Sequence, residues 1–294
     1  MKKISIIGAG TMGNGIAQVF AMNNCHVNLI DLNSSSLTNG VNRIITNLDR
    51  MIKRDIISSD QKTATLDNII TTMEINSAES SELVIEAVTE NIEIKLKLFK
   101  QLDQICSKET ILATNTSSIS ITEIAASTNR PEKVIGMHFM NPVPIMKLIE
   151  VIRGRKTSDE TTKSIIEISE TIKKIAIEVN DCPGFIANRI LLPMINEAIE
   201  ALNTGVAKVS NIDSIMKIGM GYPMGPLQLA DFIGLDVCLS ILEVMYEGFK
   251  DSKYAPSELL VNMVKSGKLG VKSGEGFYDY SESKKAEVVA KQFQ

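Results

Sequence analysis

The glycine-rich turn near the start of the chain constrains the fold more than any other feature. Lys3–Ile7 is a short run rich in β-branched residues, and it leads into Gly-Ala-Gly-Thr-Met-Gly at residues 8–13. Apolar residues then recur at helical spacing, and Val27–Ile30 predicts a second strand that ends at Asp31. The order strand, glycine turn, helix, strand and acid forms a βαβ unit. It predicts an α/β fold with a Rossmann-type, doubly wound and mainly parallel sheet.

Each glycine of this turn has a separate physical role in binding a dinucleotide. Gly8 permits the tight turn, Gly10 lets a pyrophosphate approach the backbone, and Gly13 lets helix and strand pack closely. The helix N-terminus adds N–H donors and the positive end of its dipole. We therefore expect Gly8, Gly10, Thr11, Met12 and Gly13 to bind the cofactor, although a plain βα turn can also need glycine.

Asp31 indicates which dinucleotide binds. Its carboxylate is placed to accept hydrogen bonds from the adenosine ribose and would repel a 2′-phosphate, and the following Leu32, Asn33 and Ser34 include no arginine to bind one. NAD (as NADH in reduction) is therefore favoured over NADP. An FAD enzyme carries the same fingerprint but usually needs a longer chain than these 294 residues.

Composition excludes several other classes of protein. The chain is long enough for about two domains, and its 44% hydrophobic and 22% charged residues are typical of a soluble globular protein. The net charge of −4 predicts no nucleic-acid partner. No apolar run approaches the length of a membrane span. The four cysteines are scattered without metal-ligand spacing, so we expect them to be reduced, with no metal site and a cytoplasmic location.

The pattern along the chain divides it into two domains. Strand and helix patterns alternate over residues 1–184, the predicted NAD-binding Rossmann domain, with a polar helical hairpin as an arm at about 34–75. Beyond Pro183-Gly184 the patterns are helical only, which predicts a helical domain over residues 185–280. The last residues, 281–294, are polar and charged and are expected to form a loose tail. Further predicted helices cover Asn91–Cys106, Ile119–Ala126, Thr157–Ile175, Phe185–Leu202, Asn211–Lys217, Leu227–Phe249 and Ser257–Lys265.

Two apolar strand patterns, Val134–Phe139 and Leu148–Ile152, each carry one ionisable residue. These are His138 and Glu150, and prolines stiffen the loop between the strands. A carboxylate in so apolar a strand is costly to bury unless it is paired. If the strands are neighbours, Glu150 can orient the imidazole of His138 for general acid–base catalysis. A satisfied core histidine and a glutamate at a solvent-facing edge are the structural alternatives.

Other polar residues follow the predicted strands, where open α/β sheets bind their ligands. Asn115 and Ser117 follow the strand at Thr110–Thr114; this polar run is either part of a site or a helix cap formed by Ser117 or Ser118. Glu90 and Lys95 follow the strand at Leu83–Val88 and either line the nicotinamide side of the site or lie on a helix surface. Asn188 either faces a cleft between the domains or faces solvent, and we expect His26 to be structural.

As a set, these motifs resemble one family along nearly the whole chain. The set comprises Gly8-x-Gly-x-x-Gly13, Glu86-Ala-Val-x-Glu90, Asn115-Thr-Ser-Ser118, His138-Phe-x-Asn-Pro-Val-Pro144, Met146-Lys-Leu-x-Glu150-Val, Pro183-Gly-Phe-x-x-Asn-Arg189, Met220-Gly-Tyr-Pro-Met-Gly-Pro226 and Gly274-x-Gly-Phe-Tyr278. It resembles the short-chain L-3-hydroxyacyl-CoA dehydrogenase family, which includes bacterial 3-hydroxybutyryl-CoA dehydrogenases.

The resemblance implies a reaction and a catalytic dyad. In such an enzyme His138 takes the proton of the substrate 3-hydroxyl as hydride leaves for the nicotinamide, and Glu150 holds the ring tautomer. Ser117 and Asn188 match positions that hydrogen-bond the hydroxyl and the thioester carbonyl. The implied activity is NAD-dependent interconversion of (S)-3-hydroxyacyl-CoA and 3-oxoacyl-CoA, with acyl-CoA as the substrate and a homodimer formed through the helical domain.

The resemblance also implies binding residues outside the glycine turn. Cofactor-contacting positions are matched by Asp31, Glu90, Lys95, Asn115, Ser117, Asn141 and Lys272. Lys53 and Arg54 in the arm match the region that contacts the nucleotide end of CoA. Two rival functions share parts of this pattern: oxidation of a free sugar acid, which needs no CoA arm, and a structural NAD-fold protein without turnover, as in the related lens crystallins.

Overall fold

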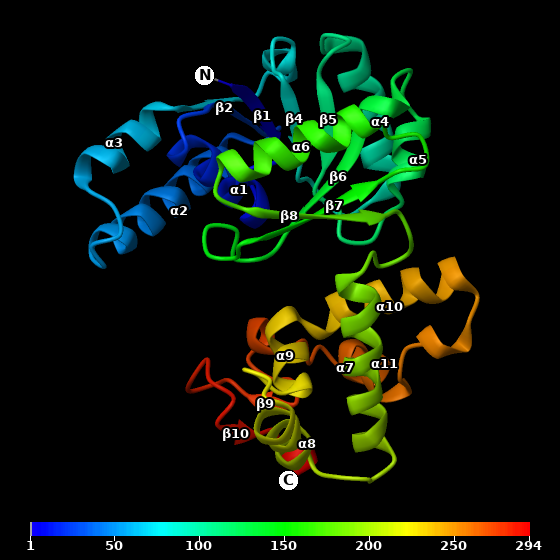
Figure 1. The fold of residues 1–294 in the computed structure, drawn as a ribbon. Helices are drawn as coiled ribbons and strands as arrows, with labels where there is room; N and C mark the ends of the chain where they lie inside the picture. The colour runs from blue at the N-terminus through cyan, green and yellow to red at the C-terminus, as the bar shows by residue number, and fades with distance from the viewer. Residues whose placement is uncertain (1) are drawn as a thin grey trace. The chain divides into compact units, whose positions relative to one another are not determined.

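The computed structural model describes residues 2–294, and the chain forms two compact units. The first reaches to Cys182 and the second covers Pro183–Gln294. Each unit has a hydrophobic core of its own. Figure 1 shows a mixed sheet and helix layer in the first unit and a set of helices in the second. This confirms the predicted fold class.

An eight-stranded sheet organises the first unit. Its strands follow the order β3-β2-β1-β4-β5-β6-β7-β8, and every neighbouring pair is parallel except β6 and β7, which are antiparallel. The bounds are β1 Lys3–Ile7, β2 His26–Ile30, β3 Ile69–Thr72, β4 Leu83–Glu86, β5 Ile111–Thr114, β6 Val134–Phe139, β7 Leu148–Arg153 and β8 Ile175–Asn180. The chain leaves the centre in both directions from β1, so the topological switch point lies between β1 and β4.

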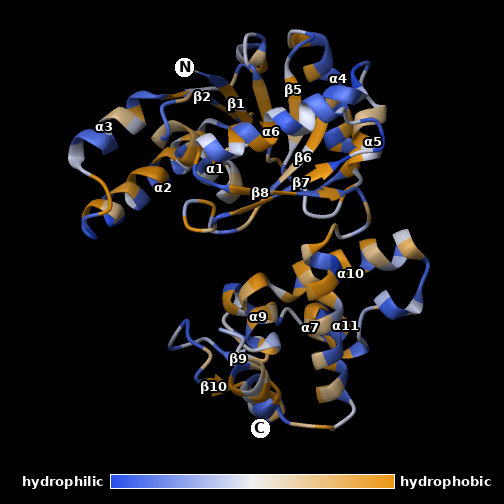
Figure 2. Ribbon diagram, viewed as in Figure 1, coloured by the Kyte–Doolittle hydropathy of each residue, from blue (hydrophilic) through white to orange (hydrophobic). Residues whose placement is uncertain are grey.

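The helices of this unit cover the apolar strands. They are α1 Thr11–Met22, α2 Ser34–Ile52, α3 Ser59–Asp67, α4 Ile92–Ile105, α5 Ile121–Ala126 and α6 Asp159–Thr171. Figure 2 shows apolar strands such as β1 beneath helices with polar outer surfaces, among them α6. Helix α1 packs on β1 and β2, while α6 packs on β7 and β8. The central strands β1, β2, β4 and β5 are mostly apolar because both of their faces are buried.

One local prediction in the first unit was wrong, and one of two alternatives is excluded. The arm predicted at about 34–75 contains α2 and α3, with a capping box from Ser58 to Gln61, but its last part is strand β3 at the sheet edge. Four residues with half-exposed side chains give too short a pattern to distinguish strand from helix. Helix α5 is capped by Ser120, whose side chain accepts from the Glu123 amide, and not by Ser117 or Ser118.

The second unit is mainly helical. Its helices are α7 Ala187–Asn203, α8 Val209–Ser214, α9 Pro226–Ile233, α10 Leu235–Phe249 and α11 Glu258–Lys265. The single helix predicted over Leu227–Phe249 is two helices, because the chain turns at Gly234 with φ 105°. Only glycine adopts that conformation at low cost, so this residue ends α9 and starts α10.

The prediction of a loose tail was also wrong. Strand β10, Val288–Val289, pairs antiparallel with β9, Tyr278–Asp279. The Ala290 amide donates to the Phe277 carbonyl at 3.0 Å, and the Phe293 and Phe277 rings stack with centroids 5.6 Å apart. The sequence after Ser281 is mostly polar, so the short apolar segment at Val288–Ala290, which returns to the core, was not recognised.

Two buried aspartates hold the glycine motifs of the second unit together. Asp231 accepts from the amides of Phe277 and Tyr278 at 3.0 and 2.9 Å. Asp213 accepts from the Tyr278 hydroxyl at 2.8 Å. A Cβ at Gly276 would lie 1.9 Å from Asp231 Oδ1, so this glycine is required by the close approach of the carboxylate. The motif around Gly276 therefore stabilises this unit.

This arrangement predicts an unusual pH dependence of stability. Burial raises the pKa of Asp231 to about 7, against hydrogen bonds that lower it. The unfolded chain releases this proton near pH 4, so the folded chain holds the extra proton between about pH 4 and 7. Stability is therefore lost as the pH rises through this window, by at most about 1.4 kcal/mol per pH unit.

Urea unfolding at several pH values between 5 and 8 tests this expectation. All five tyrosines lie in the second unit and the chain has no tryptophan, so tyrosine fluorescence reports on this unit. In Asp231→Asn the side chain is neutral throughout, and the pH dependence of the free energy of unfolding should become smaller than in the wild type. Equal slopes for the two proteins would contradict the assigned protonation.

Candidate active site

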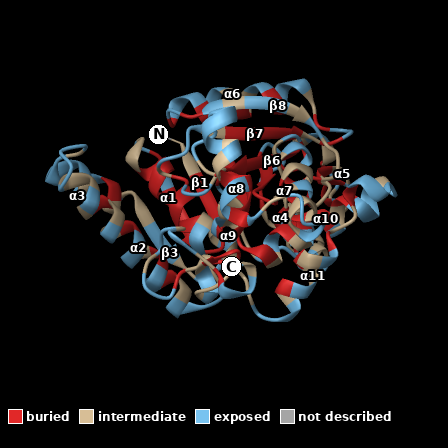
Figure 3. Cartoon of the chain, turned by 90° about the horizontal axis from the view of Figure 1, so that it is seen from below, coloured by how far each residue is buried: buried red, intermediate tan, exposed pale blue. Residues whose placement is uncertain are grey.

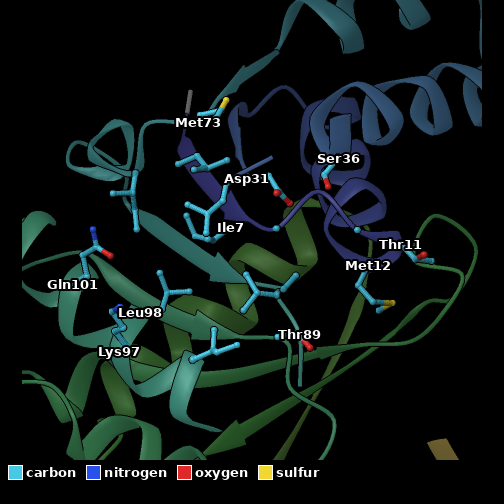
Figure 4. Close-up of a pocket in the computed structure, with 18 residues that line it drawn as sticks. Ile7, Thr11, Met12, Asp31, Ser36, Met73, Thr89, Lys97, Leu98 and Gln101 are labelled. Carbon is cyan, nitrogen blue, oxygen red and sulfur yellow. The ribbon is translucent and has the colours of Figure 1, made fainter. Parts of the chain in front are cut away.

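A cavity of about 890 Å³ opens at the carboxyl ends of the central strands. Its walls include Gly8 after β1, Asp31 after β2 and Thr89 after β4. Figure 4 labels Asp31 and Thr89. The remaining lining residues are Ile7, Gly10, Thr11, Met12, Ile30, Leu32, Ser36, Met73, Ile75, Ala87, Val88, Ile94, Lys97, Leu98 and Gln101. The cavity lies at the switch point of the sheet, where doubly wound folds bind nucleotides.

The three glycines of the turn are required for different reasons. Gly8 has φ +103°, and a Cβ there would lie 2.6 Å from the Ala87 carbonyl oxygen. A Cβ at Gly13 would lie 1.8 Å from the Gly8 oxygen, so this glycine allows α1 to pack on the turn. A Cβ at Gly10 would meet nothing within 4 Å. Gly10 borders the cavity, so its missing side chain leaves room for a ligand rather than for the protein.

Asp31 is held at the rim of the cavity by the backbone. Its Oδ2 accepts from the Ala9 amide at 2.8 Å, and its Oδ1 accepts from the Asn33 amide at 3.0 Å. These bonds connect the end of β2 to the glycine turn and fix the carboxylate beside Ser36 (Figure 4). Each oxygen keeps capacity for a further donor, so the arrangement fits the hydroxyls of a ribose.

One wall of the cavity was missed in the sequence. Ile94, Lys97, Leu98 and Gln101 all line it from α4, and Figure 4 shows the last three side by side on that helix. Their spacing is that of one face of a helix, which is the signal that predicts this wall. Charged residues on α4 suggested a solvent-facing helix and obscured it.

His138 and Glu150 lie directly opposite each other in the antiparallel pair β6 and β7. His138 Nδ1 and Glu150 Oε2 are 2.8 Å apart, and the residues are 7% and 3% exposed. Opposite residues in such a pair project from the same face of the sheet, which explains the contact. Strand β8 covers the outer side of β7, and Figure 3 shows β7 buried beside the exposed β8. Glu150 is therefore not at a sheet edge.

Glu90 organises the polar loop that follows β5. Its Oε1 accepts from the Thr116 hydroxyl at 2.5 Å and from the amides of Ser117 and Ser118 at 2.9 and 3.1 Å. Burial would raise the pKa of the Glu90 carboxyl, but Lys95 and the bonds from Thr116 and Ser117 outweigh it and hold the pKa below its usual range. Glu90 is therefore an anion that fixes the position of Ser117.

Lys95 does not lie on a helix surface. Its side chain is 1% exposed, and Nζ lies 2.6 Å from Glu86 and 3.3 Å from Glu90. Glu86, at the end of β4, also accepts from the Thr114 hydroxyl at 2.7 Å. A buried lysine needs such partners, since an unpaired charge in the core is costly. The network joins β4, β5 and α4 beneath the loop.

Asn115 connects this loop to the strand that carries the histidine. Its Oδ1 accepts from the Phe139 amide at 2.9 Å, and its side chain is buried. The loop is thus held between Glu90 and β6. As a result, Ser117 and His138 are positioned from the same edge of the sheet.

Other expected site residues lie elsewhere. Asn141 is exposed after β6, and its peptide bond to Pro142 is cis. Lys53 and Arg54 are exposed in the turn that joins α2 to α3. Asn188 lies on α7 in the second unit, where Lys272 also forms an ion pair with Asp236. Their roles stay predictions.

Comparison with known proteins identifies the family. Residues 3–182 match the NAD-binding domain of 3-hydroxyacyl-CoA dehydrogenase, and residues 184–280 match its C-terminal domain. The chain belongs to the 3-hydroxyacyl-CoA dehydrogenase family. It is an oxidoreductase, and its NAD-binding domain supports a nicotinamide cofactor.

Several relatives match the chain over nearly the whole length of both proteins. A probable 3-hydroxybutyryl-CoA dehydrogenase of Bacillus subtilis (strain 168) is 52% identical over 96% of this chain and 98% of its own. A 3-hydroxybutyryl-CoA dehydrogenase of Bradyrhizobium diazoefficiens is 48% identical over 97% of both chains. The crystal structure of (S)-3-hydroxybutyryl-CoA dehydrogenase from Ralstonia eutropha superposes with a TM-score of 0.93 at 45% identity, covering 96% of this chain and 100% of that one.

The second and third glycines of the turn, Gly10 and Gly13, allow a matched test of the cavity. Gly10→Ala adds a methyl group only where a ligand would lie, so we expect an unchanged Tm and an NADH dissociation constant at least about 10-fold higher. Gly13→Ala places a Cβ against the Gly8 oxygen, and its Tm should fall by more than about 5 °C. Calorimetry and the fluorescence of bound NADH measure both effects. Tight NADH binding by Gly10→Ala would show that the ligand does not approach this backbone.

Proposed function

We propose that the protein interconverts (S)-3-hydroxyacyl-CoA and 3-oxoacyl-CoA with NAD, and that 3-hydroxybutyryl-CoA is its short-chain substrate. The observation that carries the proposal is the buried His138–Glu150 pair on the same sheet edge as the nicotinamide-dinucleotide cavity. Oxidation of an alcohol to a ketone needs both a hydride acceptor and a base for the hydroxyl proton. Two relatives that are 52% and 48% identical to this chain are named probable 3-hydroxybutyryl-CoA dehydrogenase and 3-hydroxybutyryl-CoA dehydrogenase.

In the proposed mechanism His138 is the general base. When bound, the nicotinamide supplies the hydride acceptor for C3. His138 Nε2 takes the 3-hydroxyl proton as the C3–H bonding pair leaves, so the C–O bond becomes a carbonyl. In the reductive direction the same nitrogen returns the proton to the carbonyl oxygen. The geometry suits this role because Glu150 lies 2.8 Å from Nδ1, where its carboxylate can hold a proton, so we assign the proton transfer to Nε2.

Glu150 is proposed to orient the imidazole ring of His138 and to make it a stronger base. A carboxylate at Nδ1 favours the tautomer with the proton on that nitrogen, and it stabilises the imidazolium formed during oxidation. Both residues are buried, so the interaction is stronger than in water. Ser117, held by Glu90 through its amide, is proposed to hydrogen-bond the substrate hydroxyl. Asn188 is proposed to bind the thioester carbonyl.

The cofactor contacts follow from the site and the family together. Asp31 is proposed to bind the adenosine ribose, which favours NAD over NADP. Further cofactor contacts are proposed for Glu90, Lys95, Asn115, Asn141 and Lys272, and contacts with the nucleotide end of CoA for Lys53 and Arg54. For Lys95 and Asn115 the role includes positioning, because their polar groups already bind Glu86 and the Phe139 amide.

A homodimer through the second unit is part of the proposal. Large apolar side chains of this unit are exposed, which is typical of a contact surface; they include Ile190, Ile215, Ile218, Met220 and Phe232. Light scattering measures the mass of the assembly directly.

Among residues 2–294 no helix has the length and apolar character to cross a membrane.

The two histidines of the chain allow a matched test of the base. His138→Ala and Glu150→Ala should each lower kcat for acetoacetyl-CoA reduction by at least about 100-fold, with the NADH dissociation constant nearly unchanged. His26 is exposed at the start of β2, and His26→Ala should keep wild-type kinetics. If both dyad variants retain kcat within 10-fold, the proton-transfer role is wrong.

Substrate and cofactor preference are tested by kcat/KM across C4 to C16 3-oxoacyl-CoAs with NADH and with NADPH. We expect C4 and NADH to be preferred, and Asp31→Ser to reduce the preference for NADH at least about 10-fold by removing the charge that repels a 2′-phosphate. Failure of free CoA to compete would favour a free-acid substrate. NADH binding without any turnover would favour a structural protein.

A further inference from the structure

Lys174 is a buried cation outside the site described so far. It follows α6, is 7% exposed, and its Nζ donates to the carbonyl oxygens of Val143 and Met146 at 2.6 Å each. Among the described residues, no carboxylate forms an ion pair with it. The ammonium group therefore binds backbone only, at two points of one loop.

That loop joins the two strands of the dyad. Within it the amides of Ile145 and Met146 both donate to the Pro142 carbonyl, at 3.0 and 2.9 Å, forming a tight turn. The carbonyls that Lys174 binds are left outside this turn pattern. Without the lysine they would be polar groups turned toward a buried side chain, at a cost of about 1–3 kcal/mol each.

The other side of the same loop packs on the helix of the cofactor turn. Val143 is 2% exposed, and a Cβ added to Gly15 of α1 would lie 2.9 Å from its Cβ. Helix α1 begins at Thr11, which lines the cavity. The loop is thus held between Lys174 on one side and α1 on the other, with Asn141 at its start.

We propose that Lys174 is a positioning residue for the dehydrogenase reaction: it holds the 140–147 loop against α1, so that Asn141 and the glycine turn bind the nicotinamide dinucleotide together. This inference rests on the proposed function for its link to turnover, but its link to NADH binding can be measured separately. The dyad contact is fixed by strand register, so Lys174 acts on cofactor binding more than on proton transfer.

A lysine suits this position for a physical reason. Its flexible stem reaches from the end of α6 to the loop, and its compact ammonium group offers three donors. Methionine has a similar length and shape but no donor. The pair Lys174→Met and Lys174→Arg therefore separates the hydrogen bonds from the packing. The neighbouring Lys173 is exposed, so Lys173→Met makes the same change without the contact.

The experiment measures NADH affinity by the fluorescence of the bound dinucleotide, and kcat and KM for acetoacetyl-CoA reduction. In Lys174→Met we expect the dissociation constant of NADH and the KM for NADH to rise at least 10-fold. The kcat at saturating NADH should change by less than 3-fold. Lys173→Met should match the wild type, and Lys174→Arg should recover most of the affinity. A lower Tm with unchanged NADH affinity would overturn the proposal, because the role would then be structural only.

A second variant moves the loop from the opposite side. Gly15→Ala favours helix formation in α1 but pushes its Cβ against Val143. It should also weaken NADH binding, so the proposal stays testable if Lys174→Met does not fold. Normal NADH affinity in a folded Gly15→Ala protein would overturn it. A wild-type protein that binds NADH but does not turn over acetoacetyl-CoA would overturn the proposed function instead. The NADH affinities of the wild type and the variants would still test the role of Lys174.

Discussion

The antiparallel register of β6 and β7 is the constraint on which the active site depends. It places His138 opposite Glu150, so their contact needs no flexible loop or adaptable side chain. The six parallel strand pairs and their helical crossovers bring the cavity to the same edge of the sheet. A slip of one residue in β7 would turn Glu150 to the opposite face of the sheet from His138. Strand pairing therefore sets the geometry of the proposed catalytic pair.

Around this pair the protein uses charged side chains to fix the backbone. Glu90 binds the amides of the loop after β5, and Lys95 lies between it and Glu86. Lys174 binds two carbonyls of the loop between β6 and β7. In the second unit Asp231 binds two amides of the segment that follows Gly276. In each case an ionised or ionisable group replaces a regular ladder of hydrogen bonds where the chain leaves a strand or helix.

Local patterns predicted much of this structure. The glycine turn, the strands that follow it and Asp31 are recognisable because their signals lie within one βαβ unit. The His138–Glu150 contact could be predicted only on the assumption that their two strands are neighbours, because the sequence does not show which strands pair. Lys174 gave no such signal: two adjacent lysines at the end of a helix look like a solvated surface, and only the path of a loop distant in sequence buries one of them. The strand β3 and the docked C-terminal segment were missed because each contributes only a few apolar residues.

We propose that Glu150 holds the neutral imidazole of His138 with its proton on Nδ1, so that Nε2 serves as the base. Long-range ¹⁵N–¹H NMR of the ¹⁵N-histidine protein measures this directly, and the chain has only two histidines to assign. We expect the neutral form of His138 to show a protonated Nδ1 and an unprotonated Nε2, and we expect Glu150→Gln to alter this pattern while His26 keeps its own. A neutral His138 with its proton on Nε2 in the wild type would show that Glu150 does not set the tautomer.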